Sequence, residues 1–194
     1  MQDAVRTILM YGVVPLWILA GLGDWWWHRR TAIERNAGVL ESAMHSLMMV
    51  QVGIPVLLAL FLEINAMLFA IMLVAVVVHA VTAWIDVAYA SKWREIRPGE
   101  QHMHSLLEML PVMAVALIAS AYWDQFLALF GAGPAQADFA LRLKDQPLPA
   151  RYLAGLFVTL LFLVVAPYAE ELLRCARARG QGRAAMPAGH RRKA

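Results

Sequence analysis

Five long apolar stretches alternate with short polar segments along the chain. They cover residues 8–22, 39–62, 66–89, 105–129 and 152–173. A membrane-spanning helix needs ~17–25 mostly apolar residues to cross a hydrocarbon core ~30 Å thick. Every stretch except the short first one reaches that length. The pattern therefore predicts an all-α, polytopic membrane bundle of about five transmembrane helices.

The composition supports a bilayer protein rather than a soluble domain with a large core. Hydrophobic residues make up 61% of the 194 and charged residues 16%, whereas soluble domains average ~45–50% and ~25%. The length allows one helical domain over residues 1–173 and leaves no room for a nucleotide-binding module. We expect residues 174–194, which are basic, to form a disordered tail. The single cysteine, Cys175, excludes an intramolecular disulfide.

Positive charge is distributed unevenly between the two sides of the predicted bundle. Of the 17 Lys and Arg residues, 13 fall on the side that receives segments 23–38, 90–104 and 174–194. Excess Lys and Arg mark the cytoplasmic side of a membrane protein. We therefore expect a multi-pass protein of the cell inner membrane with its N-terminus outside and its C-terminus in the cytoplasm. The basic tail is interpreted as a topology signal and not as a nucleic-acid-binding site.

Ionisable residues gather at the cytoplasmic ends of these stretches, at helical spacings. Asp24 and His28 are four residues apart, so a helix would place them on one face. Glu34, Glu41 and His45 are separated by seven and four residues, which again gives one stripe. Three tryptophans precede His28 and are typical of a membrane interface. We expect this polar segment to form a short separate helix lying on the cytoplasmic surface.

The third and fourth stretches add further groups at the same side. His79 and Asp86 are seven residues apart, and His104 and Glu108 are four apart, with His102 just before them. An ionisable side chain inside a bilayer costs ~2.5–3.5 kcal/mol on insertion scales, so such residues usually face the bundle interior and mark a functional site. The spacings predict that one face of each helix contributes to that site.

Imidazole and carboxylate groups are the ligands that iron, zinc and manganese share. A bound divalent cation would offset the burial of several carboxylates at once. The number of groups fits two metals, or one metal with hydrogen-bonded partners behind its ligands. The predicted metal ligands are His28, Glu41, His45, His79, Asp86, His104 and Glu108, with Asp24, Glu34 and His102 as ligands or as partners that orient ligands.

The segments "DWWWH", "ESAMH", "HAVTAWID" and "HMHSLLE" together resemble the membrane-embedded di-iron oxidases, the lipid desaturase and hydroxylase superfamily. Those enzymes place histidine-rich boxes at the cytoplasmic ends of membrane helices. The resemblance implies two Fe ions, hydroxylation or desaturation of a lipophilic substrate taken from the bilayer, and an external electron donor. The HxxxH and HxxHH boxes of that family are absent here, and acidic residues stand where imidazoles would be expected.

Two alternatives remain open. The same groups, with Ser42 beside Glu41, resemble membrane zinc hydrolases of the ceramidase and adiponectin-receptor type, in which a zinc-bound water would attack a lipid amide or ester. That family normally has seven spans and a late HxxxH, which this sequence lacks. A metal or proton transporter is the further alternative. It would need polar groups on both sides, and the external half offers only Glu63, Asn65 and Asp124.

Overall fold

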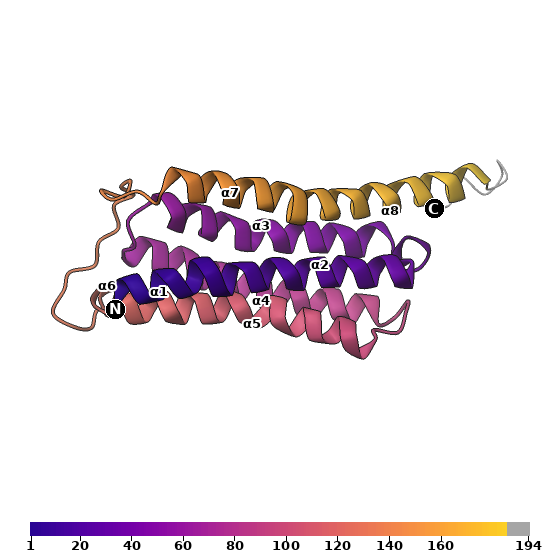
Figure 1. Ribbon diagram of the computed structural model, residues 1–194. Coiled ribbons are helices and arrows are strands. Elements are labelled where there is room, and N and C mark those ends of the chain that lie inside the picture. Colours follow the sequence, from indigo (N-terminus) through magenta and orange to yellow (C-terminus); the bar gives the residue numbers. More distant parts are fainter. Residues whose placement is uncertain (186–194) are drawn as a thin grey trace.

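The computed structural model describes residues 1–185, and within them five helical stretches run along an elongated bundle (Figure 1). The first comprises α1 (Gln2–Ile8), the π-helical turn η1 (Leu9–Val13) and α2 (Val14–Thr31), and the next three are α3 (Val39–Phe61), α4 (Ala66–Ala90) and α5 (Pro98–Ala121). The last comprises α7 (Ala150–Leu160), η3 (Leu161–Val165) and α8 (Ala166–Ala185), while η2 (Ile33–Arg35) and α6 (Trp123–Leu129) lie in connections. All five stretches are long and apolar enough to cross a membrane, which confirms the predicted all-α bundle.

The helix boundaries differ from the predicted ones at several places; the first span begins at Gln2 instead of residue 8, and the fourth ends at Ala121 instead of residue 129. The expected separate surface helix is wrong, because α2 continues without a break to Thr31 and ends where Ala32 adopts a left-handed φ of 52°. The fourth span begins earlier than expected, at Pro98. The fifth continues past residue 173 to Ala185. Residues 186–194 of the predicted tail lie outside the described residues.

Two prolines sit inside the first and last spans without ending them. A proline lacks the N–H that a helix needs, and its ring crowds the carbonyl four residues earlier. Here η1 ends two residues before Pro15, and η3 ends two residues before Pro167. The wider π-helical turn gives the proline ring room, so each span stays one continuous helix.

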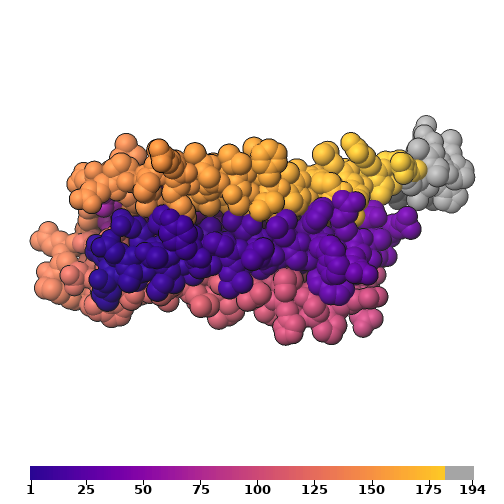
Figure 2. Space-filling view, viewed as in Figure 1, coloured from indigo at the N-terminus to yellow at the C-terminus, as the bar shows by residue number. Residues whose placement is uncertain are grey.

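The spans pack as a closed ring in the order α2, α5, α4, α3 and α8, with α8 returning to α2. Figure 2 shows α7 and α8 running along the first span for the length of the bundle. The outward faces are apolar; on α4, for example, Val74, Val77, Val81 and Trp84 are all exposed. In a membrane these faces contact lipid, so the ring interior is where polar side chains gather.

The two ends of the ring differ in character. Near the N-terminus, an apolar core forms around Leu68, Phe69 and Met72, and the Asn65 side-chain amide donates to the Ala140 carbonyl at 2.7 Å. The connections 32–38 and 91–97 lie at the opposite end, toward which α8 runs, and η2 in the first of them contacts α8 (Figure 1). Buried ionisable residues concentrate there, and we call it the polar end.

Candidate functional site

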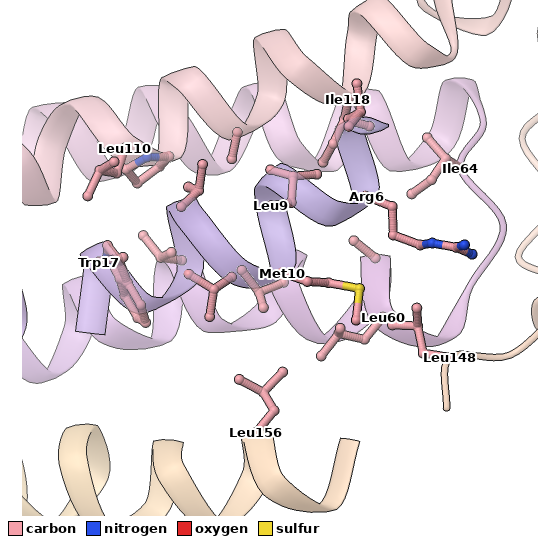
Figure 3. Close-up of a pocket in the computed structure, with 18 of the residues that line it drawn as sticks. Arg6, Leu9, Met10, Trp17, Leu60, Ile64, Leu110, Ile118, Leu148 and Leu156 are labelled. Atoms are coloured by element: carbon pink, nitrogen blue, oxygen red, sulfur yellow. The ribbon is translucent and has the colours of Figure 1, made fainter. Parts of the chain in front are cut away.

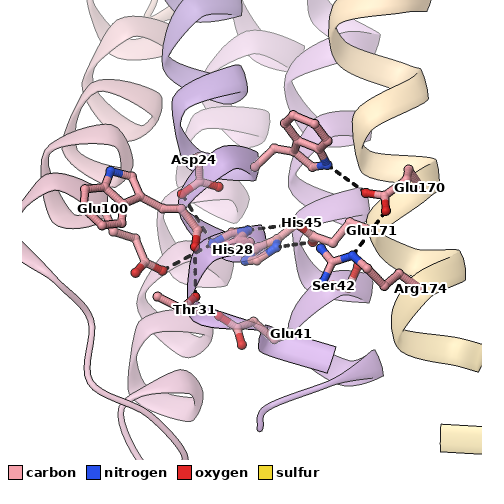
Figure 4. Close-up of polar contacts among 12 residues, drawn as sticks. Asp24, His28, Thr31, Glu41, Ser42, His45, Glu100, Glu170, Glu171 and Arg174 are labelled. Carbon is pink, nitrogen blue, oxygen red and sulfur yellow. Dashed lines mark hydrogen bonds and ion pairs between the residues drawn. The ribbon is translucent and has the colours of Figure 1, made fainter. Parts of the chain in front are cut away.

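Two stacked histidines form the centre of the polar end. The rings of His28 on α2 and His45 on α3 are buried and nearly parallel, with centroids 4.4 Å apart and an interplanar angle of 7°. Glu171 on α8 lies beside both rings (Figure 4). Its Oε2 is 2.9 Å from His28 Nδ1, and its Oε1 is 2.9 Å from His45 Nδ1. An ionised carboxylate only accepts hydrogen bonds, so both Nδ1 atoms donate. Each ring therefore presents its Nε2 atom away from Glu171.

Carboxylates from α2 and α5 face the Nε2 atom of His28. Asp24 Oδ1 lies 3.4 Å from it, and Glu100 Oε1 lies 3.3 Å from it. His104 on α5 approaches the same carboxylate, with its Nε2 2.9 Å from Asp24 Oδ1. Those two atoms are close but are not aligned for a hydrogen bond. Four side chains from two helices thus converge on one point.

His45 has the corresponding partner on α4. Its Nε2 lies 3.2 Å from Asp86 Oδ2, and both side chains are buried. Each of the five spans therefore supplies at least one group to the same site. We call these seven residues the cluster: Asp24, His28, His45, Asp86, Glu100, His104 and Glu171.

Several cluster atoms are buried and have no hydrogen-bond partner among the described residues. They include Asp24 Oδ1, His28 Nε2, Asp86 Oδ1 and both ring nitrogens of His104. A buried polar atom without a partner costs ~1–3 kcal/mol. Two sets of donor atoms, Asp24–His28–His45 and His28–Glu100–His104, each lie within 4.8 Å of one another. Imidazole and carboxylate donors gathered in this way fit divalent metal ions.

Arg94, from the connection between α4 and α5, binds two carboxylates at the edge of the cluster. Its Nε donates to Glu41 Oε1 at 3.1 Å and its Nη1 donates to Glu100 Oε2 at 2.9 Å. Burial alone would lower the pKa of Arg94, but the hydrogen bonds and ion pairs with Glu100 and Glu41 outweigh it and raise that pKa above its usual range. Glu41 is therefore held by Arg94, while Glu100 is shared between Arg94 and His28.

Close packing between α2 and α5 brings their cluster residues together. A Cβ atom on Gly99 would lie 2.4 Å from the Trp27 ring, and one on Gly23 would lie 2.6 Å from the sulfur of Met103. Real Cβ atoms do not approach so closely. A side chain at position 23 would displace only the flexible end of Met103, whereas Gly99 must be glycine against the rigid Trp27 ring. Gly99 immediately precedes Glu100, and this contact sets the start of α5 against α2.

Outside the cluster, α8 is tied to the first span and to η2. Glu170 accepts from Trp25 Nε1 at 3.0 Å and from Arg174 Nε at 3.2 Å. Arg174 also forms an ion pair with Glu34. These contacts fix the rotation of α8 and thereby aim the neighbouring Glu171 at the two histidines.

A cavity of about 250 Å³ adjoins the cluster inside the ring. Its polar lining includes Asp24, His45, Asp86 and His104, and most of the remaining wall is apolar. His79 also lines it; the ring is buried, and its Nδ1 has no hydrogen-bond partner among the described residues. The cavity reaches the surface at exposed residues of α4 and α5, among them Trp84 and Glu108.

The structure brings together half of the ten predicted ligands: Asp24, His28, His45, Asp86 and His104. The others lie elsewhere: Glu41 binds Arg94, Glu34 binds Arg174, His79 and Glu108 line the cavity, and His102 is exposed on α5. That these residues bind a metal stays a prediction.

Two cluster members are absent from the predicted ligand set. Glu100 carries a usable signal, because it stands four residues before His104 on the same helix. Glu171 carries a weaker one, since Glu170 and Glu171 form an acidic pair at the end of an apolar stretch. Its partners lie 143 and 126 residues earlier in the chain, so no local spacing connects them.

No known protein family, curated protein or solved structure matches this chain. The function is therefore argued from the chemistry of the cluster and its cavity.

Proposed function

We propose that the protein is a membrane-embedded oxidoreductase whose cluster holds two iron ions and which hydroxylates or desaturates a lipophilic substrate. One observation carries the proposal: all five spans contribute an imidazole or a carboxylate to a single buried cluster. A bundle gains nothing in lipid from burying seven ionisable groups together unless they have a shared partner. A divalent cation is the partner that matches this donor set.

The number of donors favours two ions over one. A single zinc site uses three or four protein ligands. Here three imidazoles and three carboxylates face one another in front of Glu171, which is more than one ion needs. His28 belongs to both groups of donor atoms, but its one remaining nitrogen would bind a single ion, so the other donors would be divided between the two ions.

The remaining residues prepare the cluster for that role. Glu171 accepts the Nδ1 protons of His28 and His45, so the Nε2 atoms of both rings would be the ones to bind metal; a metal ion at His45 would replace the hydrogen bond that its Nε2 makes with Asp86. Arg94 offsets the charge of Glu41 and Glu100, so the site does not carry every carboxylate as excess negative charge. Two bound irons would supply the oxygen chemistry that an unreactive C–H bond requires. The largely apolar cavity wall would exclude bulk water from the site.

The charge distribution favours one orientation in the membrane, and the cavity favours one route for the substrate. Segments rich in Lys and Arg adjoin the cluster, which favours a cytoplasmic polar end and C-terminus in the cell inner membrane. The cavity reaches the lipid-facing side near Trp84, so the substrate would arrive laterally from the bilayer. Electrons would come from a separate reductase.

Elemental analysis of the detergent-purified protein tests the proposal directly. We expect about two irons per chain, most of that iron lost in His45→Ala, and wild-type iron content in His102→Ala. His102 is the matched control because it is exposed on α5 and lies outside the cluster. One zinc per chain would instead support the hydrolase. The absence of stoichiometric metal after aerobic and anaerobic purification would refute the metal site.

A further inference from the structure

Three cavities follow one another inside the ring. The first, of about 250 Å³, adjoins the cluster and shares His79 with a second of about 70 Å³ between α3, α4 and α5. The second shares Pro111 and Ala114 with a third of about 200 Å³ toward the N-terminal end. Figure 3 shows this third cavity, with Trp17 and Arg6 far apart along its length; Trp17 also lines the first cavity. Together the volumes lie in the ~300–1,000 Å³ range of ligand sites.

The length of this path matches one lipid chain. Ala114 is ten residues beyond His104 on α5, which corresponds to ~15 Å along a helix that rises ~1.5 Å per residue. One leaflet of a hydrocarbon core ~30 Å thick is also ~15 Å deep. The middle cavity is the smallest of the three, and the in-helix prolines Pro55 and Pro111 both line it.

The polar part of the first cavity indicates the chemistry of the ligand's head. His79 is only 6% exposed, and its Nδ1 has no partner among the described residues. Among those residues, no Lys or Arg lines this cavity, whereas Asp24, Asp86 and Glu108 do. A carboxylate or phosphate head at His79 would meet the carboxylate of Glu108 and find no cationic side chain, because the proposed metal ions would lie among the cluster residues, ~10 Å from His79 along the axis at Asp86. A neutral oxygen could form a hydrogen bond with His79.

We infer that the cavities bind a long-chain primary alcohol, with its hydroxyl group at His79 in the cavity that adjoins the cluster and its chain directed past Pro111 and Ala114 into the third cavity. The inference rests on the proposed function, since it names the substrate class of the same site. The orientation is that of a lipid in the leaflet at the polar end, with the head at the interface and the tail toward the membrane centre.

Scintillation-proximity binding of a tritiated sixteen-carbon alcohol to the full chain in detergent tests the path. Thermal unfolding of each variant shows whether it is folded. We expect Ala114→Phe to weaken binding of the alcohol at least tenfold while its thermal unfolding stays as in the wild type, because Ala114 lines both the second and the third cavity. Ala116→Phe is the matched control, because Ala116 is exposed on the same helix and lines none of the three cavities. Equal binding of the alcohol by the two variants would refute the proposed binding path through the cavities.

The head group is tested by competition and by a second variant. We expect a sixteen-carbon carboxylate to compete at least tenfold less well than the alcohol, and His79→Leu to weaken binding of the alcohol. Equal competition by the carboxylate would refute the inference that the site selects an uncharged head group. Binding is measured with and without a chelator, alongside iron content. Stoichiometric iron without alcohol binding would refute this inference alone, whereas alcohol binding by a chain that never holds metal would support it and refute the proposed function.

Discussion

Replacement of Glu171 by glutamine gives the sharpest test of how the cluster is organised. The carboxylate accepts one hydrogen bond from each stacked histidine, both at 2.9 Å. A glutamine of nearly the same size has one oxygen that accepts and one NH2 group that donates. The NH2 group would face the Nδ1 of either His28 or His45. That ring would then have to move its proton from Nδ1 to Nε2, and a protonated Nε2 cannot bind metal.

The expected effect of Glu171→Gln is therefore the loss of one ligand and not general collapse. Removing the outer hydrogen-bond partner of a metal-binding histidine costs ~10–100-fold in metal affinity. A hydrogen bond to a charged group is worth ~1.5–3 kcal/mol, and a tenfold change in affinity corresponds to ~1.4 kcal/mol, so the two estimates agree. We expect one iron to bind ~10–100-fold more weakly while the other stays bound.

Iron titration under anaerobic conditions, with metal content read after dialysis at fixed free iron, measures this difference. Glu170→Gln is the control, because Glu170 is adjacent in sequence but contacts Trp25 and Arg174 instead of the histidines. It should retain wild-type affinity for both ions. Wild-type iron affinity and stoichiometry in Glu171→Gln would refute the role assigned to this carboxylate.

Three further outcomes are expected. Arg94→Gln leaves two buried glutamates without their cation and should destabilise the protein by ~3–5 kcal/mol in detergent-unfolding assays. Arg97→Gln, at an exposed position, should change the stability little. Equal stabilities of the two variants would contradict the buried ion pair. Gly99→Ala should cost ~1–3 kcal/mol through its clash with Trp27, while Gly155→Ala, with open space around it, should be neutral or slightly stabilising. Chelation should lower the stability by ~2.7 kcal/mol if the metal had been held at 100 times its dissociation constant, and unchanged thermal unfolding would argue against a structural metal.

The sequence pattern predicts well where helices form and which of their faces are polar. It predicts poorly how far along the bundle axis each residue lies. His79 and Asp86 share a stripe on α4, yet seven residues separate them by ~10 Å along the axis, so only Asp86 reaches the cluster. Glu108 likewise lies one turn beyond His104 and lines the cavity instead. Helical spacing reports direction around the axis, whereas the level of the site depends on how neighbouring helices are shifted along one another.

Other differences arise from contacts between distant segments. The spacing between Glu41 and His45 suits two metal ligands on one helix face. In the structure, however, the Glu41 carboxylate binds Arg94, which lies in a connection 53 residues later. Hydropathy marks where a helix leaves the apolar layer and not where it ends, so α8 continues past residue 173 on its Arg- and Ala-rich sequence. Likewise nothing between Gly23 and Thr31 breaks a helix, and α2 extends through the polar segment.

The bridge formed by Glu171 has a consequence for biosynthesis. It joins His28 in the first span to a residue of the last, so the complete set of donors exists only after the ribosome has made nearly the whole chain and the fifth helix has entered the bilayer. Until then the nascent protein carries unpaired carboxylates and imidazoles at the membrane boundary. If the cluster holds metal as proposed, loading of that metal would be a late step of maturation, and a chain that stops short of α8 would be inserted and helical but unable to mature.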